Sequence, residues 1–370
     1  MIQRIVIKIG SSSLNHSTGG LDEASIENIV KVISEISCQG IECILVSSGA
    51  VAAGVGKLGL SAKPRDIAGK QAAASVGQGV LIEKYAQALE NYNLVGAQVL
   101  LSRTDLAEPL HYKNAQNTLE RLLKYKAMPI INENDTVAVE ELCFGDNDRL
   151  SALVAGLIHA DLLIILTDVD GLYTANPRTD SNAKLIAEVE DISKVNGLAG
   201  GAGSQLGTGG MITKIKAAKM ATRFGIGVYL LNSKRMNELP SFFKGEKLTG
   251  TYFIPSNHRL VGKKRWIAYA GLSEGSIYID DGAVKALVRE GKSLLAKGIT
   301  GVEGEWERKE LVRIVNKKGT EIARGLAELS SEEVLQTRGK HSQEVLILIP
   351  DLEGEEIVHR DNMTLMVKES

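Results

Sequence analysis

Short apolar runs alternate with amphipathic segments from residue 5 to residue 231. The clearest apolar run spans residues 162–166, and residues 5–9 and 43–46 form two more. Between the last two runs, isoleucine and valine recur at helical spacing over residues 26–36. Apolar strands that alternate with helices are typical of a parallel sheet covered on both faces. The sequence therefore predicts an α/β fold, a three-layer sandwich with a mostly parallel central sheet.

The remaining elements of this region follow from the same two periodicities. Strands are predicted at residues 95–101, 128–132 and 228–231, and helices at residues 66–90, 118–125, 148–159 and after Lys214. From residue 275 the elements are shorter, with strands predicted at residues 276–280, 311–315, 321–326 and 345–349 and one helix at 282–289. Short strands separated by glycine and charged turns favour a small, mainly-β, barrel-like domain. We expect a large domain at 1–250, a linker at 251–274, the small domain at 275–355 and a tail at 356–370.

Composition narrows the class of protein. The 370-residue chain has a net charge of −2, which gives no reason to expect nucleic acid as its main partner. No apolar run approaches the ~20 residues that cross a bilayer, and the first residues lack the order of a signal peptide. The three cysteines form no CxxC pair, as expected of reduced cysteines in a cytoplasmic protein.

Polar residues follow four of the predicted strands. These sets are residues 8–12, 47–49, 132–135 and 167–168. In an open parallel sheet, ligands bind beyond the carboxyl ends of the strands. The four sets are therefore expected to meet at one edge of the sheet, although they are far apart in sequence.

A glycine-rich segment precedes the helix that begins near Lys214. It reads Gly207, Thr208, Gly209, Gly210, Met211, Ile212, Thr213 and Lys214. It lacks the adjacent Gly-Lys pair of a Walker A loop, and Ile212 stands where the dinucleotide fingerprint needs its third glycine. Backbone amides and the positive end of a helix dipole favour a phosphate here, and a flexible loop that caps the helix is the alternative.

Lys8 and Asp148 extend this phosphate hypothesis. A lysine within an apolar strand is usually an end position with its amine in water. Beside Gly10 and two serines, Lys8 is also suited to a phosphate, and with Lys214 it would provide the charge neutralisation that phosphoryl transfer needs. Asp148, in a segment that alternatively forms an Asx turn and N-cap, is placed to lie between the two lysines and keep them protonated.

Three further residues are candidates for a small polar substrate. Asp135 and Asn147 are suited to an amino group and a polar tail, and Ser48 with the Gly49 backbone to a carboxylate. The sequence has no Ser-His-Asp or HExxH signature, and its six histidines are scattered.

These segments resemble the amino acid kinase family. The matching stretches are IVIKIGSSSL, LVSSGAVAAG, INENDTV, FGDNDRLSALVA, LTDVDGLYTANPR and GTGGMITK, in this order. The C-terminal stretches GSIYIDDGAVKAL, GKSLLAKGITGVEG and EIARGL resemble a PUA domain. Within the family, a PUA domain marks the members that act on glutamate, whereas aspartate kinases carry ACT domains.

The resemblance implies transfer of the ATP γ-phosphate to the side-chain carboxylate of L-glutamate, with Mg²⁺, as the first step of proline biosynthesis. Lys8 and Lys214 would stabilise the transferred group and Asp148 would organise them. Ser48, Asp135 and Asn147 would bind glutamate. ATP would contact Lys8, Thr167, Asp168, Thr208, Gly209, Gly210, Met211, Ile212, Thr213 and Lys214, and the metal would be held mainly by the ATP phosphates rather than by protein ligands.

The resemblance also implies partners. These are proline as a feedback inhibitor and a homodimer or homotetramer. Because the glutamyl phosphate product is an unstable acyl phosphate, a reductase that consumes it is expected as a further partner. The alternatives are a family member that acts on another carboxylate or on a carbamate, and an RNA-binding protein. Residues 275–353 hold 12 Lys and Arg against 14 Asp and Glu, which disfavours RNA as the main partner and leaves a regulatory or RNA-binding role of the PUA-like domain open.

Overall fold

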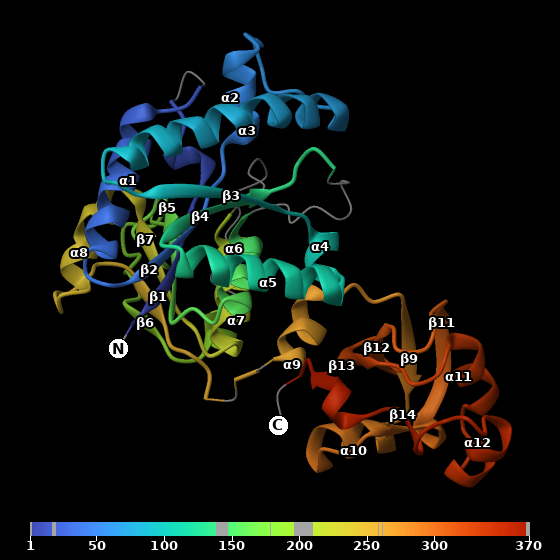
Figure 1. The fold of residues 1–370 in the computed structure, drawn as a ribbon. Coiled ribbons are helices and arrows are strands. Elements are labelled where there is room, and N and C mark those ends of the chain that lie inside the picture. Colours follow the sequence, from blue (N-terminus) through green and yellow to red (C-terminus); the bar gives the residue numbers. More distant parts are fainter. Residues whose placement is uncertain are drawn as a thin grey trace. The chain divides into compact units, whose positions relative to one another are not determined.

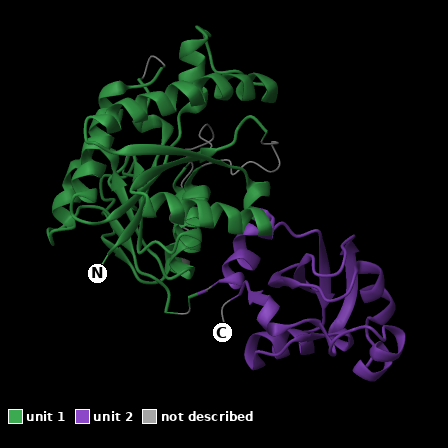
Figure 2. Ribbon diagram, viewed as in Figure 1, with its two compact units in different colours: residues 1–106, 110–259 green, residues 107–109, 260–370 purple. Residues whose placement is uncertain are grey.

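The computed structural model describes residues 2–16, 20–137, 147–177, 179–195, 210–257, 259–260 and 262–367. The chain forms two compact units (Figure 2). Unit 1 comprises residues 1–106 and 110–259, and unit 2 comprises residues 107–109 and 260–370. Within the described residues, no helix has the length and apolar character needed to span a membrane.

Unit 1 is built on a sheet of eight strands among the described residues, in the order β3-β4-β2-β1-β5-β7-β8-β6. The strands are β1 (Arg4–Ile9), β2 (Glu42–Val46), β3 (Val95–Leu101), β4 (Ala127–Glu133), β5 (Leu162–Thr167), β6 (Glu188–Val189), β7 (Gly227–Asn232) and β8 (Thr251–Phe253). The six strands from β3 to β7 are parallel, and β8 pairs antiparallel to β7. The predicted mostly parallel sheet is confirmed.

Helices cover both faces of this sheet (Figure 1). They are α1 (Glu23–Ser37), α2 (Ala50–Lys57), α3 (Ile67–Glu90), α4 (Arg103–Ala107), α5 (Pro109–Lys124), α6 (Asn147–Leu157), α7 (Met211–Arg223) and α8 (Leu239–Phe242), with short 3-10 helices at Ser11–Ser13, Ile192–Val195 and Ser233–Glu238. Figure 1 shows α1 and α3 on one side of the sheet and α6 and α7 on the other. The three predicted layers are therefore present.

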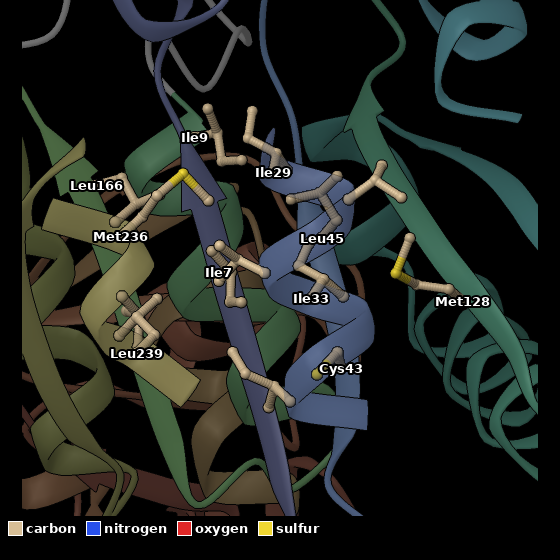
Figure 3. Packing of buried hydrophobic residues seen from close by; sticks show 14 of the residues in the cluster. Ile7, Ile9, Ile29, Ile33, Cys43, Leu45, Met128, Leu166, Met236 and Leu239 are labelled. Atoms are coloured by element: carbon tan, nitrogen blue, oxygen red, sulfur yellow. The ribbon is translucent and has the colours of Figure 1, made fainter. Parts of the chain in front are cut away.

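Strand β1 shows why one of its residues is available for chemistry. Side chains of a strand alternate between its two faces. Ile5, Ile7 and Ile9 belong to one buried cluster with Ile29 of α1, and Figure 3 shows this packing. Burial of each such side chain contributes roughly 1.5–3 kcal/mol. The opposite parity places Lys8 on the other face, which α6 covers.

Unit 2 has a separate core and two sheets among its described residues. One sheet has the order β11-β9-β12-β13-β15, and the other pairs β10 with β14. The strands are β9 (Gly275–Ile279), β10 (Leu294–Leu295), β11 (Ile299–Gly304), β12 (Leu311–Asn316), β13 (Glu321–Leu326), β14 (Glu356–Val358) and β15 (Met363–Leu365). The helices are α9 (Lys263–Arg265), a π-helix (Trp266–Ala270), α10 (Asp281–Glu290), α11 (Ser331–Thr337) and α12 (Ser342–Leu348), with 3-10 turns at Ala296–Gly298 and Arg360–Asn362. The segment predicted as a linker contains β8, α9 and the π-helix, and the predicted tail contributes β14 and β15.

The strand predicted at residues 345–349 is wrong, because this segment lies in α12. A short apolar run alone does not distinguish a strand from a buried helix. The decisive signal is at its start, where the Glu344 carboxylate accepts a hydrogen bond from the His341 backbone N–H at 2.9 Å. This is half of a capping box, which favours a helix start, and Pro350 follows shortly after the helix ends.

Candidate active site

Three charged side chains from three elements meet at the carboxyl end of β1. The Lys8 Nζ lies 2.6 Å from Oδ1 of Asp148, and the Lys214 Nζ lies 3.1 Å from Oδ2. Asp148 is in the first turn of α6, and Lys214 is in the first turn of α7. Lys8, Asp148 and Lys214 are 2%, 0% and 7% exposed, respectively. The sequence predicts that Asp148 lies between the two lysines, and these two distances agree with that prediction.

Two ammonium groups share the Asp148 carboxylate in a buried position. Burying ions costs several kcal/mol for each ion unless they are paired and hydrogen-bonded. The Thr213 hydroxyl lies 2.8 Å from Asp148 Oδ2, and it is also 2.8 Å from the Gly210 carbonyl oxygen. Gly210 is the N-cap of α7, so the free N–H groups and positive dipole end of this helix lie beside Lys214. The arrangement attracts an anion.

A second group is neutral and lies around Asn147, the first residue of α6. The Asn147 Nδ2 is 2.6 Å from the Ser47 carbonyl oxygen and 3.0 Å from Ser48 Oγ. It is also 2.9 Å from the side-chain oxygen of Asn132. Gly49 follows with φ of +105°, a left-handed conformation that a side chain would strain, and α2 begins at the next residue. The sharp turn after β2 thus brings Ser48 to Asn147.

Asp135 lies two residues beyond the end of β4 and is half-buried. Burial raises the pKa of its carboxyl group above the usual value, and the charge of Lys63 partly opposes this shift. Within the described residues, Asp135 makes no hydrogen bond or ion pair to the lysine cluster or to Asn147. The described contacts therefore do not link its carboxylate to either group.

Thr167 and Asp168 lie at the end of β5, the strand that pairs with β1. Thr167 is buried, and its hydroxyl is 3.2 Å from Asp168 Oδ1, whereas Asp168 is exposed. Gly210, Met211, Ile212 and Thr213 form the start of α7. Thr208 and Gly209 lie outside the described residues.

The sequence did not single out the side chains that support Asn147. Asn132 is 2% exposed, and its Nδ2 donates to the Gln78 Oε1 at 2.8 Å. The fully buried Tyr85 places its hydroxyl 3.0 Å from Ser47 Oγ. Asn132 and Ser47 lie in polar segments recognised at strand ends, but Gln78 and Tyr85 sit in α3 with no motif to mark them.

The structure offers little to hold a metal through protein ligands. Among the described residues, no group of three or more histidine, cysteine, aspartate or glutamate side chains is arranged to hold a metal ion. Both Asp148 oxygens are already engaged by lysines.

Comparison with known proteins gives two matches that divide the chain. Residues 3–232 match the amino acid kinase family, and residues 275–348 match the PUA domain. The chain is 70% identical over 367 residues to a glutamate 5-kinase of Desulfitobacterium hafniense, with 99% of each chain covered. It is 46% identical over 365 residues to a glutamate 5-kinase of Moorella thermoacetica, with 98% of this chain and 96% of the relative covered.

The fold has relatives among solved structures. Carbamate kinase from Giardia lamblia bound to AMP-PNP superposes with a TM-score of 0.51 at 16% identity, which covers 69% of this chain and 99% of that chain. At that identity the likeness concerns the fold alone. The sequence matches are far stronger, and together they establish that the chain belongs to the amino acid kinase family and carries a C-terminal PUA domain.

Proposed function

We propose that this protein is an ATP-dependent kinase that phosphorylates the side-chain carboxylate of L-glutamate, giving L-glutamyl 5-phosphate, the first step of proline biosynthesis. Relatives of nearly equal length, named glutamate 5-kinases, support the substrate. The observation that carries the chemistry is the buried cluster of Lys8, Asp148 and Lys214.

The cluster is suited to a migrating phosphoryl group. In such a transition state, negative charge is spread over the equatorial oxygens, and catalysis rests on positioning and charge neutralisation. Lys8 and Lys214 supply two ammonium groups, one at each oxygen of Asp148. Asp148 contacts both ammonium groups and fixes their separation, so it acts as a positioning residue.

The acceptor needs no general base. The glutamate side chain has a reference pKa of ~4.3 and is therefore ionised at neutral pH. One of its carboxylate oxygens attacks the γ-phosphorus, a new O–P bond forms, and the bond to the bridging β,γ-oxygen breaks. ADP leaves with that electron pair, and no proton is transferred. The absence of a histidine from this group of residues agrees with such a step.

We assign ATP to the amino end of α7, with Thr167 and Asp168 at the end of β5 beside it. The predicted contacts of Thr208, Gly209, Gly210, Met211, Ile212 and Thr213 belong to this part of the proposal. Mg²⁺, when bound, supplies further charge neutralisation and would be held mainly by the phosphates. Helix α7 begins next to Lys214, and β5 ends beside β1, the strand that carries Lys8. Both positions support the assignment.

We assign the amino acid to Ser48, Asn147 and Asp135. Ser48 and the turn at Gly49 are suited to its α-carboxylate, and Asp135 and Asn147 to its ammonium group. Asn147 and Asp148 are consecutive in α6, so the first turn of this helix contributes to both the amino-acid end and the phosphoryl end of the proposed site. This adjacency supports an in-line transfer between them.

The remaining assignments are also proposals. We expect a cytoplasmic homodimer or homotetramer that proline inhibits and whose product passes to a glutamyl phosphate reductase. We keep the division into a kinase domain (1–250), linker (251–274), PUA domain (275–355) and tail (356–370).

Unit 2 contains a cavity of about 690 Å³ lined by residues of both charges, including Lys297, Arg360, Asp280 and Glu356. This mixed lining is unlike the basic face of an RNA-binding surface, which disfavours RNA as the main partner and leaves the role of the PUA domain open.

Hydroxamate formation tests the function directly, because hydroxylamine traps an acyl phosphate. We expect ATP- and Mg²⁺-dependent product with L-glutamate, and little with L-aspartate or N-acetyl-L-glutamate. Activity confined to a substrate other than glutamate would overturn the assignment.

A further inference from the structure

Helix α3 reaches the amino-acid end of the site at three points. Its side chains contact three polar residues at or just after strand ends: Gln78 with Asn132, Tyr85 with Ser47, and Ser75 with Thr136, at 2.8, 3.0 and 3.1 Å. Gln78 and Tyr85 are seven residues apart and therefore lie on the same face of the helix. One helix thus supports the segments that carry Ser48, Asn132 and Asp135.

Backbone groups fix the direction of the hydrogen bonds around Asn147. The Ser47 carbonyl can only accept, so Asn147 must turn its NH₂ group toward it. The Glu133 backbone N–H can only donate, and it lies 2.9 Å from the Asn132 side-chain oxygen. Asn132 must therefore turn its NH₂ group toward Gln78, which has to present its oxygen.

This order has a consequence for the substrate. Because the NH₂ group of Asn147 faces Ser47, Ser48 and Asn132, its side-chain oxygen is directed away from them. An amide oxygen is an acceptor and suits a donor such as an ammonium group. A reversed amide would present a donor to the ammonium group and repel it.

Helix α3 is well anchored for such a role. A Cβ at Gly77 would lie 1.8 Å from the Ala50 carbonyl oxygen, and one at Gly54 would lie 1.7 Å from the Ala73 carbonyl oxygen. The backbones of α2 and α3 therefore touch, which only glycine permits. Since α2 starts directly after Gly49, α3 is fixed relative to the turn that holds Ser48.

We infer that Gln78 is a positioning residue for substrate selection: through Asn132 it holds in place the Asn147 amide, which the Ser47 carbonyl orients so that its oxygen can accept from the α-ammonium group. The inference rests on the proposed function, because it assumes that glutamate is the acceptor. Gln78 itself touches neither substrate.

The test compares L-glutamate with glutarate, which has the same carboxylates but no amino group. In Gln78→Leu, the ratio of kcat/KM for glutamate to that for glutarate should fall roughly tenfold, the effect of one lost buried hydrogen-bond partner. The KM for ATP should stay within about twofold, as the bond lies at the other substrate. Gln78→Glu keeps an acceptor oxygen and should retain the wild-type ratio.

Gln87→Leu is the matched control, because Gln87 is an exposed residue of α3 bonded only to Glu83 among the contacts described. If Gln78→Leu does not fold, Asn132→Asp removes the donor of the same bond and should lower the ratio likewise. An unchanged ratio in an enzyme that phosphorylates glutamate would overturn this inference alone. A wild-type enzyme without glutamate-dependent turnover would overturn the proposed function, and the inference with it.

Discussion

The two ends of the candidate site hold their side chains by different interactions, ion pairs at one end and neutral hydrogen bonds at the other. At the phosphoryl end, Lys8 and Lys214 are held by full charges on the buried Asp148. At the amino-acid end, Asn147 is held by neutral amides, a hydroxyl and a carbonyl. Removing one partner of a buried ion pair leaves an uncompensated charge, whereas removing one neutral partner leaves only one unsatisfied group. The charged end should therefore respond to substitution strongly and in turnover, and the neutral end weakly and in substrate affinity.

The largest effect should come from Lys8→Ala or Lys214→Ala. Each removes a charge that acts mainly in the transition state, so kcat should fall by roughly 10²–10³-fold with little change in the KM for glutamate. Steady-state kinetics with both substrates varied measure this. Lys216→Ala is the control, because Lys216 is exposed and lies two residues away on the same helix. Near-normal turnover in either variant would remove that lysine from the proposed mechanism.

Asp148→Asn should give the largest loss of stability. The amide keeps the shape of the side chain but removes the negative charge that both buried ammonium groups contact, which costs about 3–5 kcal/mol. Urea unfolding followed by far-UV circular dichroism measures it, since both tryptophans, Trp266 and Trp306, lie in unit 2.

Lys8→Met in the Asp148→Asn background provides the internal check. It removes one of the two ammonium groups that lose the Asp148 charge, so the double variant should be more stable than Asp148→Asn alone. Equal stability of Asp148→Asn and the wild type would mean that the lysines are not held by charge.

The same contrast explains how much of the site the sequence predicts. A lysine in an apolar strand, a lysine at a helix start and an acidic segment are each unusual, so Lys8, Lys214 and Asp148 stand out. Gln78 and Tyr85 are ordinary residues of a long helix, and their partners are 54 and 38 residues away in sequence. Their role depends on tertiary packing, which local patterns do not encode. The parallel sheet is predictable because its strands are mostly apolar runs between amphipathic helices, whereas the short apolar run of α12 is equally compatible with a strand.

Asp135→Asn should have an intermediate effect on affinity. Loss of a charge-assisted contact to an ammonium group should raise the KM for glutamate by roughly ten- to a hundredfold, with the KM for ATP unchanged. A change confined to ATP would contradict the assignment of Asp135 to the amino acid.

Stability provides an independent readout for Asp135. Burial raises the pKa of this carboxyl group above 3.8, so ionisation is harder in the folded than in the unfolded protein. The contribution of Asp135 to folding stability is fully present below the pKa that it has in the unfolded protein. It is lost as the pH rises through the pKa that it has in the folded protein. Asp135→Asn should therefore unfold at a slightly higher temperature than the wild type at pH 7, and the difference should shrink as the pH is lowered toward about 4. A lower unfolding temperature at pH 7 would show that the carboxylate is stabilised by its surroundings.

The smallest effect is expected for Tyr85→Phe. This variant tests whether the hydrogen bonds at the neutral end differ in their effect on the KM for glutamate. The change removes one hydroxyl bonded to Ser47 Oγ and should cost about 1 kcal/mol of stability. The Ser47 carbonyl still accepts from Asn147, and the Ser47 hydroxyl still reaches the Ser48 carbonyl oxygen at 3.2 Å. The KM for glutamate should therefore rise by only about twofold or less, well below the effect of Gln78→Leu. A larger rise in the KM than in Gln78→Leu would place the main support of Asn147 at Ser47 rather than at Asn132.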